Sequence, residues 1–168
     1  MDALWQELTG GMSNFDMVVR VSFRLILAAL CGAFIGWERL RSGQAAGLRT
    51  HMLVSVGACL FALIILESTS SNADVSRVIQ GIVTGVGFLG AGTILKGDTA
   101  HPARGLTTAA DIWVMAAVGT AVAAGYDFMA FLGTVLTWVI LHYLHVFEHP
   151  PVASGAAAPG PPSPPQSQ

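Results

Sequence analysis

Two ionisable residues lie inside long apolar stretches of this sequence. Arg24 lies about two helical turns into the first stretch, and Asp111 lies more than one turn into the fourth. A charged side chain at such a depth in a bilayer costs several kcal/mol unless it is paired or hydrated, so both residues are candidate functional groups. The alternative interpretation is structural: Arg24 extends to water beside Asp16, and Asp111 pairs with Arg49 or Arg104 to fix the fold.

More polar side chains gather at one end of the first, second and fourth apolar stretches. They could recognise a partner or an ion, although Thr107 or Thr108 is also well placed to cap a helix start. Glu38 and Asp111 are the carboxylates that a Mg²⁺ site there could use. No nucleophile stands beside a base, so we predict that the protein is not an enzyme. The candidate residues are Arg24, Glu38, Arg39, Arg49, Thr50, His51, Thr107, Thr108 and Asp111.

Three histidines recur near the end of the fifth apolar stretch. His142, His145 and His149 are three and four residues apart, a spacing that puts them on one helical face, as a metal site requires. Only Glu148 adds a further ligand nearby. We therefore interpret the histidines as residues at the membrane interface and predict no bound metal.

A glycine pattern in the third apolar stretch matches the turn that binds dinucleotides. The residues Gly85-Val-Gly-Phe-Leu-Gly90 fit G-x-G-x-x-G, and Asp111 follows 21 residues later, where a ribose ligand could lie. Such a turn needs a strand before it and an amphipathic helix after it. Here the glycines lie within one continuous apolar stretch, so we reject this interpretation and predict no cofactor.

The composition is that of a polytopic membrane protein. Hydrophobic residues make up 53% of the 168 residues and charged residues only 11%, against about 25% charged residues in soluble domains. The formal net charge of −2 argues against a nucleic-acid partner, because such a partner calls for a basic surface.

Five apolar segments predict an all-α bundle of five transmembrane helices in the lipid bilayer. A hydrocarbon core of about 30 Å needs about 20 helical residues. Residues 1–16 are predicted to be a short extracytoplasmic N-terminus, 17–148 the five-helix domain, and 149–168 a disordered Pro-rich cytoplasmic tail. The predicted helices are Met17–Trp37, Leu48–Leu66, Val75–Leu95, Leu106–Ala124 and Phe128–Phe147.

The positions of lysine and arginine predict the orientation. The first connection carries Arg39, Arg41 and Arg49, and the third carries Lys96 and Arg104, whereas the other connections have almost no basic residue. By the positive-inside rule, the first and third connections are cytoplasmic. The N-terminus is then outside, and the C-terminus is in the cytoplasm.

Glycines predict how the helices pack. Small residues let helix backbones approach closely in lipid. Because the third segment has glycines on two opposite faces, we expect it to be the centre of the bundle, packed on both sides. Gly119-x-x-x-Ala123 suggests a matching contact on the fourth segment. The predicted packing glycines are Gly32, Gly36, Gly81, Gly85, Gly87, Gly90 and Gly92.

Four motifs occur in order: RLILAALCGAFIGWER (24–39), AGLRTHMLV (46–54), GVGFLGAG (85–92) and GLTTAA (105–110). With these motifs the chain resembles the MgtC/SapB family. The resemblance carries over the motif positions Arg24, Glu38, Arg39, Gly47, Arg49, Thr50, His51, Gly85, Gly87, Gly90, Gly92, Gly105, Thr107 and Thr108.

This resemblance implies a multi-pass protein of the bacterial inner membrane, linked to magnesium homeostasis, to stress adaptation when magnesium is scarce and, in pathogens, to virulence. Some members are thought to restrain the proton-driven ATP synthase. The virulence-related members carry a C-terminal cytoplasmic domain, which a Pro-rich tail replaces here. The chain is therefore more similar to the short, SapB-like members, and the resemblance does not carry over any contact made by that domain.

The leading functional hypothesis is a non-enzymatic regulator of another membrane complex, such as ATP synthase. Glu38, Arg39, Arg49 and His51 would form its recognition surface. The alternative is a small ion transporter or channel in which Arg24 and Asp111 line a polar pathway. Five helices enclose little room, so a conducting form would be a homo-oligomer.

Overall fold

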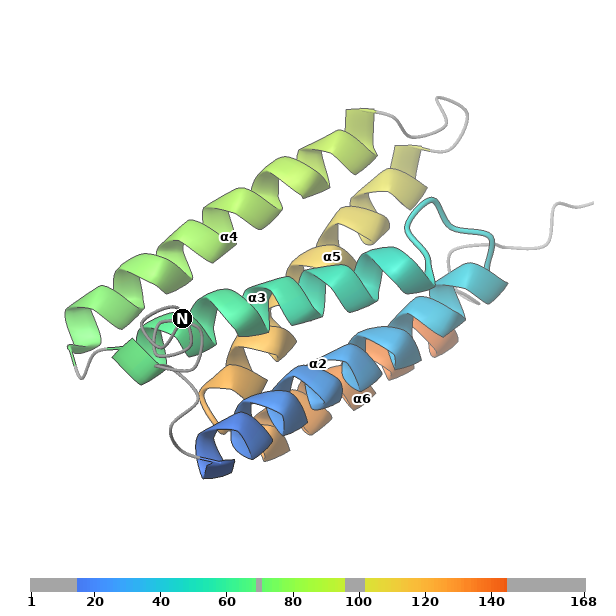
Figure 1. The fold of residues 1–168 in the computed structure, drawn as a ribbon. Helices are drawn as coiled ribbons and strands as arrows, with labels where there is room; N and C mark the ends of the chain where they lie inside the picture. The colour runs from blue at the N-terminus through green and yellow to red at the C-terminus, as the bar shows by residue number, and fades with distance from the viewer. Residues whose placement is uncertain (1–14, 69–70, 96–101, 145–168) are drawn as a thin grey trace, which may run out of the picture.

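The computed structural model describes residues 15–68, 71–95 and 102–144, with the backbone alone at 102–104. All regular structure in these residues is helical, and successive helices run in opposite directions (Figure 1). The helices are α2 (Phe15–Arg41), α3 (Leu48–Ser68), α4 (Asn72–Leu95), α5 (Pro102–Ala123) and α6 (Asp127–Tyr143). The predicted all-α bundle of five helices is confirmed.

Four of the helices, α2 to α5, are long and apolar enough to cross a membrane. The helix α6 is apolar and has 17 residues, the lower limit of about 17 for a span. Its predicted continuation to Phe147, the N-terminal segment up to residue 14, and the Pro-rich tail lie outside the described residues.

Two glycines end helices in the same way. Gly43 follows α2 with φ of 63°, and Gly125 follows α5 with φ of 78°. Glycine adopts this left-handed conformation without the strain that a Cβ brings. The chain then folds back so that the Gln44 N–H donates to the carbonyl oxygen of Arg39 at 3.1 Å, which satisfies a helix-terminal acceptor. Tight turns of this kind make neighbouring helices antiparallel.

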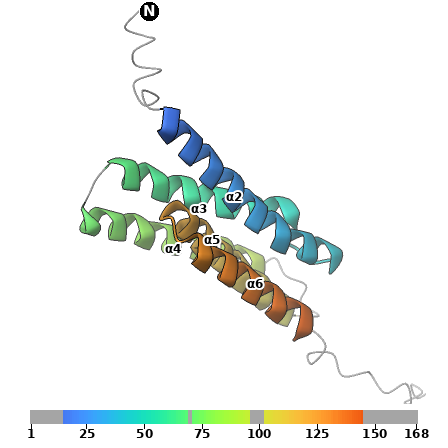
Figure 2. The ribbon, with the colours of Figure 1, turned by 90° about the horizontal axis from the view of Figure 1, so that it is seen from below.

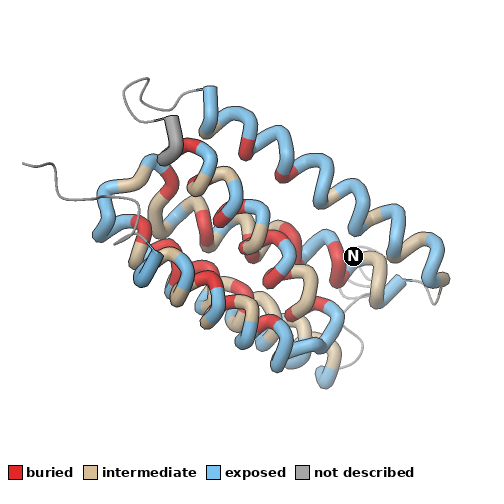
Figure 3. The backbone as a smooth tube through the Cα atoms, turned by 180° about the vertical axis from the view of Figure 1, so that it is seen from behind, coloured by how far each residue is buried: buried red, intermediate tan, exposed pale blue. Residues whose placement is uncertain are grey.

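The helix α5 is the centre of the bundle, because it contacts each of the other four helices. The helix α3 packs beside it, α2 and α6 cover one side of this pair, and α4 lies on the other side, mainly against α5 (Figures 1 and 2). Burial follows this arrangement: the buried positions concentrate in the packed helices, whereas α4 is exposed over most of its length (Figure 3).

The expectation that the third apolar segment is central is therefore wrong. Only Val86 and Gly90 of α4 are buried. Gly90 faces Ala109 of α5, whose Cβ would be 3.3 Å from an added Cβ. The other glycines of α4 do not pack against another helix of the chain, because an added Cβ would meet no atom within 4 Å. They are Gly81, Gly85, Gly87 and Gly92. A glycine allows another helix to approach closely, but it does not specify whether that helix belongs to the same chain.

Close packing occurs instead where α3 crosses α2 and α5. An added Cβ at Gly32 would lie 2.6 Å from the carbonyl oxygen of His51, and one at Gly36 would lie 2.7 Å from the Cα of Leu48. On the other side, an added Cβ at Gly119 would collide with the carbonyl oxygen of Ser55. Because these neighbours are backbone atoms, they can move only with their helix. These glycines therefore set the distance between the packed helices.

This packing predicts opposite outcomes for two conservative changes. Gly32→Ala should lower the free energy of unfolding by about 1–3 kcal/mol, because its methyl group overpacks the α2–α3 crossing. Gly92→Ala is the matched control on α4 and should leave stability unchanged or slightly higher. Thermal unfolding of both purified variants in detergent tests this expectation, and equal melting temperatures would contradict it.

Candidate functional site

The carboxylate of Asp111 is held between two helices that precede α5 in the sequence. Its Oδ2 lies 2.6 Å from Nε of Arg39 on α2, and its Oδ1 lies 3.2 Å from Nε2 of His51 on α3. The three side chains are at most 5% exposed. We call Arg39, His51 and Asp111 the buried ion cluster.

Arg39 is also fixed by a hydroxyl group. Its Nη2 donates a hydrogen bond to Oγ1 of Thr108 at 3.1 Å, and Thr108 is itself buried. Thr108 and Asp111 are three residues apart on α5, so they share one helical face. The guanidinium, with its five fixed N–H donors, thus contacts both groups of that face and turns inward from the end of α2.

His51 is oriented by the backbone before it. Its Nδ1 lies 2.9 Å from the carbonyl oxygen of Gly47, the residue just before α3. A carbonyl oxygen only accepts, so Nδ1 carries a hydrogen in this contact. The opposite nitrogen, Nε2, faces a carboxylate oxygen of Asp111. This second contact, at 3.2 Å, connects α3 to α5.

The buried ion cluster holds α2, α3 and α5 together, and we call this contact the lock. It stabilises the fold only while its charges are paired. Removing one partner of a buried ion pair costs about 3–5 kcal/mol, because the remaining charge is left without compensation. The pairing is possible because Gly32 and Gly36, about two turns and one turn before Arg39 on α2, bring α2 to backbone contact with α3. Hence glycine packing and charge pairing depend on each other.

The described partners of Asp111 are Arg39 and His51, and not Arg49. Arg49 is exposed and is not one of its contacts, and the side chain of Arg104 lies outside the described residues. Sequence reasoning proposed Arg39 and His51 for an exposed recognition surface, but both are buried. The predicted surface of Glu38, Arg39, Arg49 and His51 therefore does not exist as one patch.

Glu38 contacts a different helix. Its Oε1 lies 3.3 Å from Nδ1 of His142 on α6, and the ring of Trp138 stacks on that imidazole with centroids 5.1 Å apart. Thr50 and Thr107 are partly exposed. No group of three histidine, cysteine or carboxylate residues in the described part of the chain could hold a metal. His145, Glu148 and His149 lie outside it.

Arg24 is at the opposite end of the bundle from the cluster. Its Nη1 donates to the carbonyl oxygen of Ala123, the last residue of α5. Helix ends leave such carbonyl groups unpaired and carry partial negative charge, so a guanidinium stabilises them. Asp111 is twelve residues before Ala123, or about 18 Å along α5. The two intramembrane charges thus hold different parts of the fold and do not pair.

A sequence profile of the MgtC family matches residues 25–149. The chain belongs to the MgtC family. Membership and the apolar helices together make it a multi-pass membrane protein. The matched segment includes Arg39, His51 and Asp111 as well as α4.

Relatives within the MgtC family include YhiD of Escherichia coli K12, named as a candidate magnesium transporter, at 43% identity over 77% of this chain and 62% of YhiD. SrpB of Synechococcus elongatus is 45% identical over 72% of each chain. MgtC of Brucella abortus is 44% identical over 64% of this chain and 44% of that protein. The chain thus spans less than two thirds of the length of YhiD and of MgtC. No solved structure matches it.

The lock predicts that Asp111→Asn disrupts folding and function together. Asparagine keeps the shape but leaves the Arg39 guanidinium buried without a counter-charge, and we expect a loss of about 3–5 kcal/mol in unfolding free energy. Membrane abundance and growth on limiting magnesium should therefore fall in parallel. Glu67→Gln is the control, because it removes a surface ion pair with Arg20, which is worth at most about 1 kcal/mol. Normal abundance of Asp111→Asn with lost growth would instead assign Asp111 to ligand binding.

Proposed function

We propose that this protein is a non-enzymatic regulator in the membrane, linked to magnesium homeostasis and to adaptation to low magnesium. Membership of the MgtC family and the name of YhiD support the link to magnesium. The closure of the buried ion cluster supports the choice of a regulator over a transporter, and it is the observation that carries the proposal.

Magnesium is a poor fit to the interior of one chain. The ion prefers several oxygen ligands and retains much of its water. The one carboxylate of the cluster is already neutralised by Arg39, and Thr108 is bonded to the same guanidinium. Around the cluster, Gly32 and Gly36 place the helix backbones in contact. A hydrated cation would have to break the ion pair and separate these helices.

The outer face of α4 is the surface that we assign to a membrane partner. It carries Gln80, Thr84, Gly87 and Ala91, all exposed and spaced so that they form one stripe along the helix. Small and polar side chains favour contacts between helices in lipid. The partner is a helix of another membrane protein, such as the ATP synthase that the family resemblance implies. This stripe replaces the polar end of the bundle as the recognition surface.

The test separates partner binding from folding. Gly87→Leu should abolish complementation of a deletion strain at limiting magnesium while the membrane abundance of the protein stays normal, because Gly87 is exposed and an added Cβ meets no atom within 4 Å. Ser22→Leu is the control, since it places the same side chain on the exposed face of α2. In liposomes with an enclosed magnesium-sensitive dye, the wild-type protein should give no flux above that of empty vesicles. Magnesium flux through the wild-type protein above that level would favour the alternative of an oligomeric transporter.

We also propose that the protein lies in the bacterial inner membrane with the N-terminus outside and the C-terminus in the cytoplasm. The five antiparallel helices put Phe15 and Tyr143 at opposite ends of the bundle, and the basic residues favour this direction. A fluorescent protein fused after Gln168 should fold and fluoresce, and alkaline phosphatase fused there should be inactive. The reverse pair of results would contradict the orientation.

A further inference from the structure

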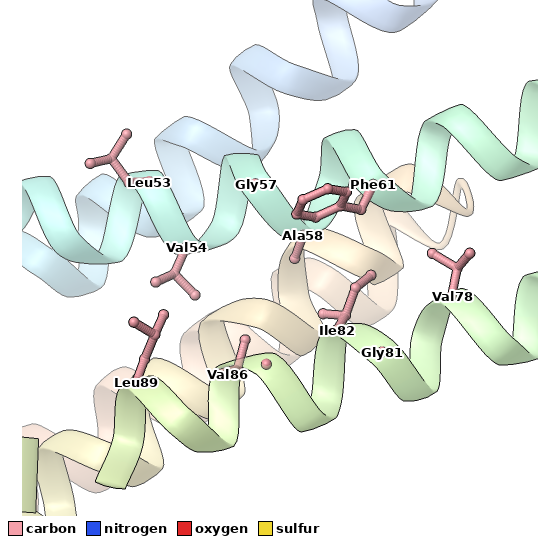
Figure 4. A pocket seen from close by; sticks show the side chains of 11 residues that line it. Leu53, Val54, Gly57, Ala58, Phe61, Val78, Gly81, Ile82, Val86 and Leu89 are labelled. Carbon is pink, nitrogen blue, oxygen red and sulfur yellow. The ribbon is translucent and has the colours of Figure 1, made fainter. Parts of the chain in front are cut away.

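A cavity separates α3 from α4. Its volume is about 550 Å³, and every residue that lines it is apolar or glycine. Leu53 and Leu89 lie at one end, Phe61 and Val78 at the other, and α5 passes behind (Figure 4). Gly57 and Gly81 leave its walls open, because a Cβ added at either would meet no atom within 4 Å. We call this cavity the α3–α4 slot.

We propose that the α3–α4 slot binds one acyl chain of an anionic phospholipid, whose phosphate group is held by Arg49. The slot lies between two helices of membrane-spanning length, so hydrocarbon chains are the molecules that surround it. Lining atoms that face a void lose their dispersion contacts, and an acyl chain restores them. This inference does not depend on the regulatory function.

The length of the slot fits one lipid acyl chain. Leu53 and Phe61 are eight residues apart on α3, which gives a slot length of about 12 Å. This is close to one leaflet of a hydrocarbon core about 30 Å thick. A single acyl chain is narrow enough to enter.

Arg49 supplies the charge that selects the headgroup. It lies one turn before Leu53 on α3, hence on the same helical face and beyond the end of the slot. Its side chain is exposed and has no ionic partner among the described residues. A guanidinium binds phosphate oxygens through two parallel hydrogen bonds. An anionic lipid is therefore preferred to a zwitterionic lipid, in which an attached cation competes for the phosphate.

Photo-crosslinking tests the proposal in the full-length protein. Vesicles contain phosphatidylglycerol or phosphatidylcholine with a diazirine on the acyl chain, and mass spectrometry locates the adducts. We expect adducts at Leu53, Phe61 and Leu89, at least about fivefold more with phosphatidylglycerol. Gly81→Leu, which fills the slot, should reduce them about fivefold, and so should Gly57→Leu from the opposite wall. Arg49→Gln should remove the headgroup preference but keep the adducts.

Three outcomes would overturn the proposal. Adducts spread evenly over the exposed faces of α2 and α6, and unchanged by Gly81→Leu and Gly57→Leu, would show ordinary bilayer contact. Equal labelling of the slot by both lipids would show that Arg49 does not select the headgroup. Protein dimers crosslinked through a photoreactive residue at Leu53 would assign the slot to a second copy. Ser22→Leu, which leaves the slot intact, must behave as the wild type throughout.

Discussion

A single buried carboxylate governs the arrangement of the helices. Asp111 has to be compensated inside an apolar bundle, and its compensation comes from Arg39 and His51, which belong to two other helices. This requirement fixes the rotation of α2, α3 and α5 about their own axes. It also requires their backbones to approach closely, which Gly32 and Gly36 allow. Close backbone packing of α2 against α3 therefore accompanies the buried ion cluster.

Polar contacts hold four of the described helices together and leave α4 outside them. At one end the buried ion cluster ties α2, α3 and α5 together, and at the other Arg24 secures the turn from α5 to α6. The helix α4 has no part in either contact and rests mainly on α5. Four of its glycines are exposed, although a central helix would have them covered: Gly81, Gly85, Gly87 and Gly92. Both proposed binding surfaces, for a partner helix and for a lipid, follow from this open position.

Sequence reasoning predicted the helices well because their signals are local. Apolar length gave five segments, and Asp111 was identified as an intramembrane charge from its depth alone. Its partners were not predicted. Arg49 and His51 are two residues apart, so they point about 200° apart around α3, and only the rotation of the helix decides which one faces α5. The prediction that α4 is central was wrong for a related reason. Its glycines permit a close contact but do not specify a neighbour in the same chain.

The central claim is that the Arg39–Asp111 ion pair locks the fold, and a double-mutant cycle measures it directly. Unfolding free energies in lipid bicelles are compared for the wild type, Arg39→Met, Asp111→Leu and the double variant. The account predicts a coupling energy of about 1.5 kcal/mol or more, with the double variant more stable than either single variant, because a lone buried charge is worse than none. A coupling energy below about 0.5 kcal/mol, with additive losses, would contradict the claim.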